Sequence, residues 1–367
     1  PGSTFKIITV TTALEEKLVD LEKDTFYDSG SIGVENARIK CWKHGGHGAQ
    51  TFLQVVENSC NPGFVVLGQK IGKEKLFEYI DKFGFGKKTG VDLNGEASGI
   101  IFNLDRVGPV ELATTSFGQG VSVTPIQQIT AVSAAINGGY LMKPYIVSSI
   151  NEPETNAVIK QNKPEIVRKV ISGDTSEKVR YTLESVVTNG TGRPAFIDGY
   201  RVGGKTGTAQ KVKDGRYMVG NYIVSFIGFL PANDPEVIVY VAVDNAKGVT
   251  QYGGTIAAPI VKSILTSAID ILNVKKPEGA SEKNYNFNEK RFINIPDVVN
   301  MEKNEATKIL KQFNIIIGVY SEKEFETNNP KSISKYEICC AIDAAYEYKD
   351  DNFRKIAIYK RDEDIII

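Results

Sequence analysis

The chain has 367 residues, of which 41% are hydrophobic and 24% are charged. This is an ordinary globular composition, and the length suits one large domain with a small one beside it. The 44 basic and 44 acidic residues give a formal net charge of zero, so the charge does not point to a nucleic-acid partner. Four cysteines are too few for a disulfide scaffold. No apolar run reaches membrane-spanning length, and no signal peptide is recognised.

Apolar periodicity predicts helices through most of the first half of the chain. The expected helices are 1–20, a segment from 51 to a break at 58–62, then 63–71, 73–83, 111–117 and 125–137. Residues 21–50 and 84–99 are rich in turn-forming residues, glycine above all, and are expected to be loops.

The second half combines strands with helices. The expected elements are short β segments around 145–150, a helix over 175–189, β-like runs at 200–210, 221–230 and 237–245, and an apolar helix over 255–272. The last helix closes a domain over 1–273. Residues 274–292 are polar and are predicted to be a linker, which leaves 293–367 as a separate small module.

The only two histidines, His44 and His47, lie in a glycine-rich segment. Two histidines at this spacing could bind a metal, but no cysteine or carboxylate cluster completes a site. A loop without metal is the favoured interpretation.

The chain opens with a serine and a lysine that can lie on one helical face. Pro1 and Gly2 mark a turn, and an apolar segment follows. Residues three apart share a face of a helix, so the Lys6 amine can approach the Ser3 hydroxyl as a base approaches a nucleophile. The alternative is an N-capping serine with a solvated lysine, and Ser332 and Lys335 repeat the spacing in a polar stretch where only that alternative applies.

Two further motifs strengthen the case for Ser3. Ser59-Cys60-Asn61 falls in the break between two predicted helices, and Lys205-Thr206-Gly207-Thr208 falls in a β-like run after two glycines. Ser149-Ile150-Asn151 and Lys88-Thr89-Gly90 have the same patterns, but they are expected in a surface turn and a loop. A Ser-x-x-Lys, a Ser-x-Asn and a Lys-Thr-Gly in this order are the set found in penicillin-binding proteins and serine β-lactamases.

Over residues 1–273 the chain resembles a class B penicillin-binding protein. Its Ser-Cys-Asn motif, together with a PASTA-like segment after residue 293, resembles the sporulation branch of that family. Other segments share the resemblance: 117–120, 124–125, 191–195, 203–210 and 253–259. The resemblance implies an α+β fold in which helices flank an antiparallel sheet. The first strands of that sheet precede the nucleophile in the family and are expected to be missing here, so the fragment is expected to be poorly active.

Residues 293–367 resemble a small α+β PASTA module at their start. The resemblance is carried by 295–301 and by a helix-like stretch over 305–313, whereas the end from Cys339 onward departs from the PASTA pattern.

The resemblance also implies a role for each motif residue. Ser3 attacks the penultimate D-Ala carbonyl of a peptidoglycan stem peptide, or a β-lactam. Lys6 is the base, for which its pKa must fall from about 10.4 to near 7. Ser59 relays a proton to the leaving group, and Asn61 holds the stem amide. Lys205 completes the catalytic set.

The strand motif has a substrate-binding role in the family. Together with Lys205, Thr206 and Thr208 suit the terminal carboxylate, and Gly207 lies between them in the substrate-binding motif. Backbone N–H groups of Ser3 and Thr208 form the oxyanion hole.

The implied activity is a serine D,D-transpeptidase that needs no metal or organic cofactor. The implied setting is the outer face of the cell membrane, with a membrane glycosyltransferase as partner and a role in spore cortex synthesis. No residue was identified that could supply the carboxylate that class A β-lactamases use for deacylation, which favours transfer over hydrolysis. A D,D-carboxypeptidase, a β-lactamase and a non-catalytic sensor of β-lactams or muropeptides remain alternatives.

Cys60 lies between Ser59 and Asn61, and Cys41 is the only other cysteine before the linker. Cys60 is either a small buried thiol or half of a redox switch. As a hypothesis, a Cys41–Cys60 disulfide would draw Ser59 and Asn61 out of register.

Overall fold

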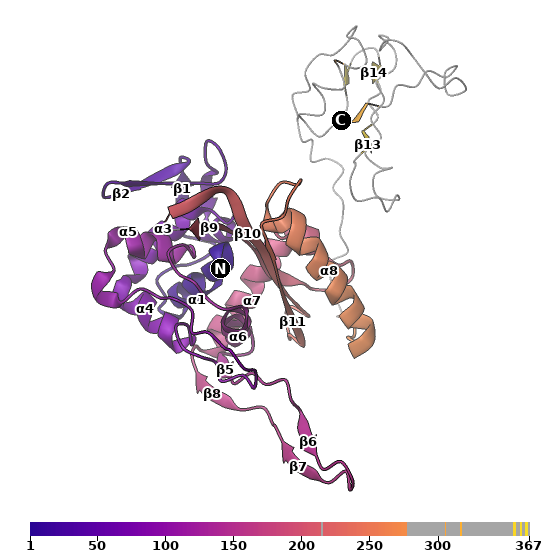
Figure 1. The fold of residues 1–367 in the computed structure, drawn as a ribbon. Coiled ribbons are helices and arrows are strands. Elements are labelled where there is room, and N and C mark those ends of the chain that lie inside the picture. The colour runs from indigo at the N-terminus through magenta and orange to yellow at the C-terminus, as the bar shows by residue number, and fades with distance from the viewer. Residues whose placement is uncertain are drawn as a thin grey trace. The chain divides into compact units, whose positions relative to one another are not determined.

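A computed structural model describes residues 1–213 and 216–276, with isolated short pieces further on (Figure 1). The chain divides into two compact units, Pro1–Lys283 and Asn284–Ile367. In the second unit the described pieces are paired two-residue strands: β12 (Ile316–Ile317) with β13 (Lys355–Ile356), and β14 (Lys360–Arg361) with β15 (Asp364–Ile365). Most of the PASTA-like prediction therefore lies outside the described residues.

The first unit is built on an antiparallel sheet with the strand order β11-β10-β9. Its strands are β9 (Gly203–Lys213), β10 (Arg216–Leu230) and β11 (Val237–Asp244). These strands correspond to the three predicted β runs. β10 is longer than expected because its first residues continue the hairpin with β9 beyond a bulge between Tyr217 and Tyr222.

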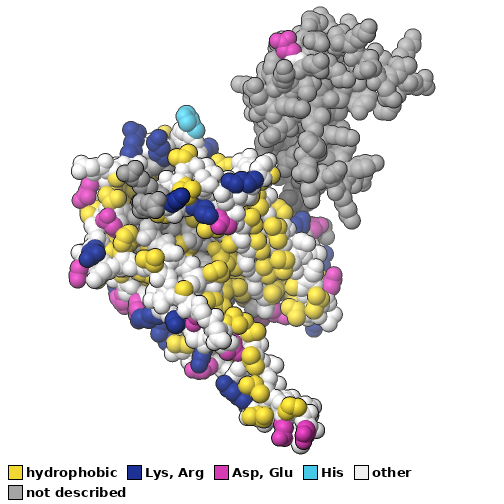
Figure 2. All heavy atoms as spheres, in the orientation of Figure 1, with side chains coloured by type: hydrophobic (Ala, Val, Ile, Leu, Met, Phe, Trp, Pro, Cys, Tyr) yellow, Lys and Arg dark blue, Asp and Glu magenta, His cyan; other side chains and the backbone are white. Residues whose placement is uncertain are grey.

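Helix α8 (Gly253–Leu272) packs on β10 and β11 (Figure 1). Its inward side chains, among them Val261 and Leu265, are fully buried, whereas Ile260 and Ile264 are exposed. The helix is long and apolar enough to span a membrane, which corrects the expectation that no apolar run has that length. Its buried face shows that here it serves as a packing helix of the sheet. Figure 2 shows hydrophobic side chains gathered over this part of the first unit.

Helix α1 (Lys6–Glu15) runs through the middle of the helical part, and every residue from Lys6 to Leu14 is buried. Helices α3, α4, α6 and α7 all contact it. The helices beside α1 are α2 (Phe52–Glu57), α3 (Asn61–Ile71), α4 (Lys73–Lys82), α5 (Pro109–Ser116), α6 (Pro125–Ile136) and α7 (Gly173–Thr188). Short 3₁₀ turns are η1 (Gly2–Phe5), η2 (Leu104–Arg106) and η3 (Arg193–Ala195).

The first predicted helix, 1–20, is too long at both ends. It begins as the 3₁₀ turn η1 and its α-helical part ends at Glu15. Lys17 has a φ of 55°, in the left-handed region that stops a helix. Burial of this central helix on all sides explains why its apolar residues gave no clear end signal.

Residues 21–50, expected to be a loop, contain two short strand pairs. These are β1 (Thr25–Asp28) with β4 (Gly48–Thr51), and β2 (Ser31–Val34) with β3 (Ala37–Lys40). Each strand has only four residues, which is too short for a reliable alternating pattern.

A narrow arm extends from the helical part in Figure 1. It is made by β5 (Tyr140–Met142) with β8 (Ile166–Lys169), and β6 (Ser149–Asn151) with β7 (Val158–Gln161). The expected surface turn at Ser149–Asn151 is therefore an exposed strand.

Candidate active site

Ser3 lies in η1, directly before the central helix, and its side chain is half-buried. The turn is held against two other elements. The Gly2 backbone N–H donates to the Gly118 carbonyl at 3.1 Å, and a Cβ on Gly2 would come within 2.9 Å of the Thr208 carbonyl. Gly2 also has a φ of 59°, so a residue without a side chain is needed there for two reasons. This contact sets the serine beside strand β9.

Lys6 is the first residue of α1 and is completely buried. Its Nζ donates to the Ser59 carbonyl at 2.8 Å, to Ser59 Oγ at 3.2 Å and to Asn61 Oδ1 at 2.7 Å. It also lies 5.1 Å from the centre of the Phe64 ring. Burial lowers the pKa of Lys6 to about 7, because the charged form loses its hydration.

Lys205 approaches the same serine from the sheet. Its Nζ donates to Ser59 Oγ at 2.8 Å, and it is also completely buried. Burial holds the pKa of Lys205 well below its usual range, and the neighbouring charge of Lys6 lowers it further. The Ser59 hydroxyl thus lies between two buried amines.

The Ser59 backbone is itself unusual. It has a φ of 52°, which places it in the left-handed region between α2 and α3. Such a conformation is costly for a residue with a side chain and is kept only where the surroundings fix it. Here the Ser59 carbonyl accepts from Lys6, and the following residue, Cys60, donates its N–H to Val55.

Thr206 connects the strand motif to a residue that sequence reasoning did not assign to the site. Lys205 Nζ donates to the Thr206 carbonyl at 3.2 Å and to its Oγ1 at 3.3 Å. The Thr206 hydroxyl lies 3.2 Å from the hydroxyl of Thr191, which in turn is held by the Glu57 carbonyl. Thr191 belongs to the segment 191–195 that shares the family resemblance, but nothing in its sequence surroundings indicates this contact.

Gly207 and Thr208 continue β9 past the nucleophile turn. A side chain on Gly207 would overlap the Ser225 hydroxyl on β10 and approach Thr4 and Pro1. Thr208 Oγ1 accepts from the N–H of Gly253 at 3.4 Å. The strand motif is therefore close-packed against the segment that carries Ser3.

The repeated motifs lie elsewhere. In the loop after α4, Thr89 donates to Glu96 and Lys88 is exposed. Ser149 is exposed on β6. Ser332 and Lys335 lie outside the described residues. The structure thus gathers one copy of each motif, namely Ser3 and Lys6, Ser59 and Asn61, and Lys205 through Thr208.

The surroundings of His47 correct the expectation that no cysteine or carboxylate cluster accompanies the histidines. Asp28, Cys41 and Cys60 each place one ligand atom near the imidazole of His47, and these atoms all lie within 4.8 Å of one another. The three residues are separated from His47 by between 6 and 19 positions, so adjacency in the sequence could not reveal them. His44, in the same loop, is exposed and takes no part. Both cysteines are free thiols.

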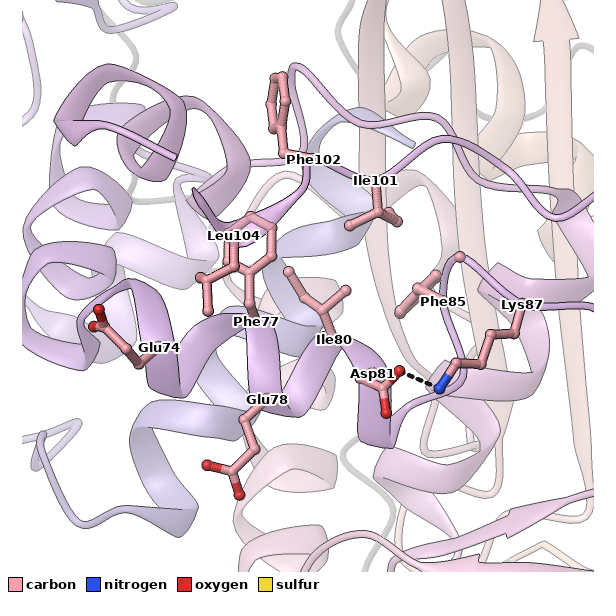
Figure 3. Close-up of a pocket in the computed structure, with 11 residues that line it drawn as sticks. Glu74, Phe77, Glu78, Ile80, Asp81, Phe85, Lys87, Ile101, Phe102 and Leu104 are labelled. Atoms are coloured by element: carbon pink, nitrogen blue, oxygen red, sulfur yellow. Dashed lines mark ion pairs between the residues drawn. The ribbon is translucent and has the colours of Figure 1, made fainter. Parts of the chain in front are cut away.

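A pocket of about 470 Å³ lies between α4 and the segment from Phe85 to Leu104 (Figure 3). Its floor is apolar, with Phe77, Ile80 and Phe102, and Lys87 pairs with Asp81 at its edge. None of the motif residues lines it, so the pocket is separate from the candidate active site.

The chain matches the family of the penicillin binding protein transpeptidase domain over residues 1–266. The chain belongs to this penicillin-binding protein family. The match covers the Ser-x-x-Lys, Ser-x-Asn and Lys-Thr-Gly motifs that the structure brings together, but only the transpeptidase part of the chain.

Curated relatives give the same family. The chain is 59% identical over 315 residues to stage V sporulation protein D of Bacillus subtilis strain 168, which is 86% of this chain and 49% of that protein. It is 33% identical over 301 residues to the peptidoglycan D,D-transpeptidase FtsI homolog of Mesostigma viride, which is 75% of this chain and 50% of that protein. The chain thus spans about half the length of these curated relatives.

Solved penicillin-binding proteins have the same fold. Penicillin-binding protein 3 of Mycobacterium tuberculosis, complexed with ampicillin, matches with a TM-score of 0.69 and 29% identity over 77% of this chain and 64% of that one. The apo transpeptidase domain of Burkholderia pseudomallei penicillin-binding protein 3 matches with a TM-score of 0.67 and 30% identity over 75% of this chain and 80% of that one. The predicted α+β transpeptidase fold is confirmed.

Proposed function

We propose that this chain is the transpeptidase part of a peptidoglycan D,D-transpeptidase that is acylated on Ser3 by stem peptides and by β-lactams. The observation that carries the proposal is the Ser59 hydroxyl, which lies 3.2 Å from Lys6 Nζ and 2.8 Å from Lys205 Nζ, both completely buried. Two buried amines that share one hydroxyl can pass protons to and from a nearby reacting serine. Exposed serines and lysines gain nothing from such an arrangement.

In the proposed reaction Ser3 Oγ forms a bond with the penultimate D-Ala carbonyl carbon and Lys6 takes the hydroxyl proton. Collapse of the tetrahedral intermediate breaks the peptide bond, and Ser59 passes a proton to the departing D-Ala amine. Backbone N–H groups of Ser3 and Thr208 stabilise the oxyanion. An amine of a second stem peptide then takes the acyl group from Ser3 and restores the enzyme.

The remaining motif residues bind the donor peptide in this proposal. Asn61 already accepts from Lys6 and offers its amide to the stem backbone. Lys205, Thr206 and Thr208 bind the terminal carboxylate, and Gly207 lets that strand approach the substrate closely. An anion favours the protonated form of a buried amine, so the substrate carboxylate itself promotes the positive charge on Lys205 that binds it.

We expect transfer to an amine rather than hydrolysis, in part because a nearby acid is already bonded to another helix. Glu57 lies two residues before Ser59, yet its carboxylate accepts a hydrogen bond from Ser185 on α7. In this proposal that carboxylate stays bonded to Ser185 and does not activate a water. A class A β-lactamase uses a glutamate for that step.

We further propose that the whole protein acts in spore cortex synthesis, anchored to the cell membrane with this part on the outer face and with a glycosyltransferase as partner. The 59% identity to a stage V sporulation protein supports the sporulation role. The domain limits 1–273, 274–292 and 293–367 and the PASTA-like character of the last segment belong to the same proposal.

The function is tested with a donor peptide that ends in D-Ala-D-Ala and a D-amino acid as acceptor. We expect mass spectrometry to detect the exchanged peptide in amounts that rise with acceptor concentration. A product that has lost D-Ala without gaining the acceptor would identify a carboxypeptidase. A chain that stays acylated by β-lactam and turns over no peptide would identify a sensor.

A further inference from the structure

Four ligand atoms of three chemical kinds meet beside the Ser59 turn. Asp28 ends β1, Cys41 follows β3, His47 precedes β4, and Cys60 lies between the two motif residues Ser59 and Asn61. Their ligand atoms lie within 4.8 Å of one another. None of these four residues has a part in the proposed reaction.

The separations suit a tetrahedral ion. Cys41 Sγ lies 3.3 Å from His47 Nδ1, and Cys60 Sγ lies 3.3 Å from Asp28 Oδ2. Zinc bonds of about 2.0–2.3 Å place neighbouring ligand atoms roughly 3.3–3.8 Å apart in a tetrahedron. The contact of 2.8 Å between His47 Nδ1 and Asp28 Oδ2 would have to open by about 0.5 Å to admit the ion.

The cluster is buried and firmly supported. Asp28 is 1% exposed, Cys60 is 0% exposed and the His47 side chain is 5% exposed. Backbone N–H groups of His47 and Gly30 donate to the two oxygens of Asp28 at 3.0 and 2.8 Å. Gly46 has a φ of 79°, and a Cβ there would overlap the Asp28 carbonyl, so only glycine lets the histidine loop fold back onto β1.

The imidazole of His47 faces the other ligand atoms through one of its two nitrogens. Among the described residues, His47 Nε2 is buried without a hydrogen-bond partner, while Nδ1 faces both a carboxylate and a thiol. The edge contact with Trp42, whose ring centre lies 5.5 Å away, holds the imidazole but does not satisfy that nitrogen. An ion bound at Nδ1 would bring the carboxylate and the thiolates onto one centre, whereas Nε2 would keep its present surroundings.

We propose that Asp28, Cys41, His47 and Cys60 bind a divalent metal ion of borderline softness, with zinc as the best chemical fit, and that this ion fixes the Ser59–Asn61 turn. Two thiolates, an imidazole and a carboxylate fill all four tetrahedral positions, which is the pattern of a structural site. The ion acts on Ser59 only through Cys60, so it is not part of the reaction.

Metal binding and disulfide formation exclude each other here, because both would use the sulfurs of Cys41 and Cys60. The metal-bound form keeps Cys60 in the position that the structure shows, next to a serine with a left-handed backbone. The prediction of a Cys41–Cys60 redox pair and the metal site are therefore alternative states of one pair of thiols.

The site is tested on the full chain with Cys339 and Cys340 changed to serine, so that Cys41 and Cys60 are the only thiols. The protein is reduced with a phosphine, exposed to zinc, freed of excess metal by gel filtration and assayed by elemental mass spectrometry. We expect one zinc ion per chain. Cobalt in its place should give thiolate-to-metal charge transfer and intense visible bands of a tetrahedral ion.

Cys41→Ser and His47→Gln are expected to lower metal content roughly tenfold or more, whereas the matched control His44→Gln, in the same loop but exposed, should retain it. Chelation should lower the melting temperature of the parent and leave that of Cys41→Ser unchanged, which separates metal loss from misfolding. Absence of stoichiometric zinc from the folded, reduced parent, or equal zinc in the parent and in Cys41→Ser, would overturn the proposal. None of these readouts depends on acylation of Ser3.

Discussion

Lysine amines carry a proton at neutral pH unless burial removes the advantage of the charge. Lys6 and Lys205 are both completely buried and share Ser59 as a hydrogen-bond partner. Two adjacent ammonium groups would repel each other, so at least one amine is neutral when the site is free of anions. We infer that Lys6, with a pKa of about 7, is the group that becomes able to accept a proton.

The pH dependence of acylation follows from this pKa. Below it Lys6 is protonated and cannot accept the Ser3 proton; above it the neutral amine predominates. We expect the second-order rate of acylation by benzylpenicillin to rise between about pH 6 and about pH 8 and then to level off. A rate that is flat or falls across this range would exclude Lys6 as the base.

Removal of the bridging hydroxyl tests the site at its centre. We expect Ser59→Ala to lower the acylation rate by roughly 10²–10⁴-fold, because the two buried amines lose their shared partner and the relay is broken. Ser149→Ala is the matched control, since Ser149 has the same Ser-x-Asn pattern but is exposed on β6. Equal acylation rates in Ser59→Ala and Ser149→Ala would show that the Ser59 hydroxyl has no role in acylation.

At the scale of elements, the site depends on how closely the nucleophile turn η1 packs on β9 and on the turn that contains Gly118. Gly118 has a φ of 84°, and a Cβ there would overlap the Gly2 carbonyl. Gly95 has a φ of 81° with open space around it. The two positions share the same backbone strain, but only at Gly118 would a side chain meet a neighbouring residue.

This difference gives a matched pair of variants. We expect both Gly118→Ala and Gly95→Ala to lose roughly 1 kcal/mol of stability from the strained backbone, with a further loss and a lower acylation rate only in Gly118→Ala. Urea unfolding and acylation kinetics measure the two effects. Acylation that is equally slow in both variants would contradict the role given to this contact.

Cys60 is part of the break between α2 and α3, so a bond to Cys41 would act on the positions of these two helices. If a Cys41–Cys60 disulfide moves Ser59 and Asn61, oxidation should lower the acylation rate and a reductant should restore it. Cys41→Ala should remove the dependence on reductant. His47→Gln keeps both thiols and should retain that dependence. Continued dependence in Cys41→Ala would refute the redox pair.

For the whole molecule, the sequence was informative where a pattern was long or was anchored by a motif. The three sheet strands and α8 were predicted because alternation and helical periodicity run over eight residues or more. The strand pairs between residues 25 and 51 were not, because four-residue strands leave no periodic signal.

The candidate site shows the same division. The motif residues could be selected from their order and context. The contacts of Thr191 with Thr206, and the cluster around His47, could not, because they join segments that are far apart in the sequence and meet only in the folded chain.

Acylation of Ser3 is tested most directly by the intact mass of the folded, reduced chain after prolonged incubation with benzylpenicillin. We expect a single adduct with the mass of the whole antibiotic, because opening of the β-lactam ring adds the molecule without a leaving group. The adduct should be absent from Ser3→Ala and retained by Ser332→Ala, which removes the serine of the other Ser-x-x-Lys pattern. An adduct that persists in Ser3→Ala, or no adduct on the folded parent chain, would contradict the proposal that Ser3 is the acylated nucleophile.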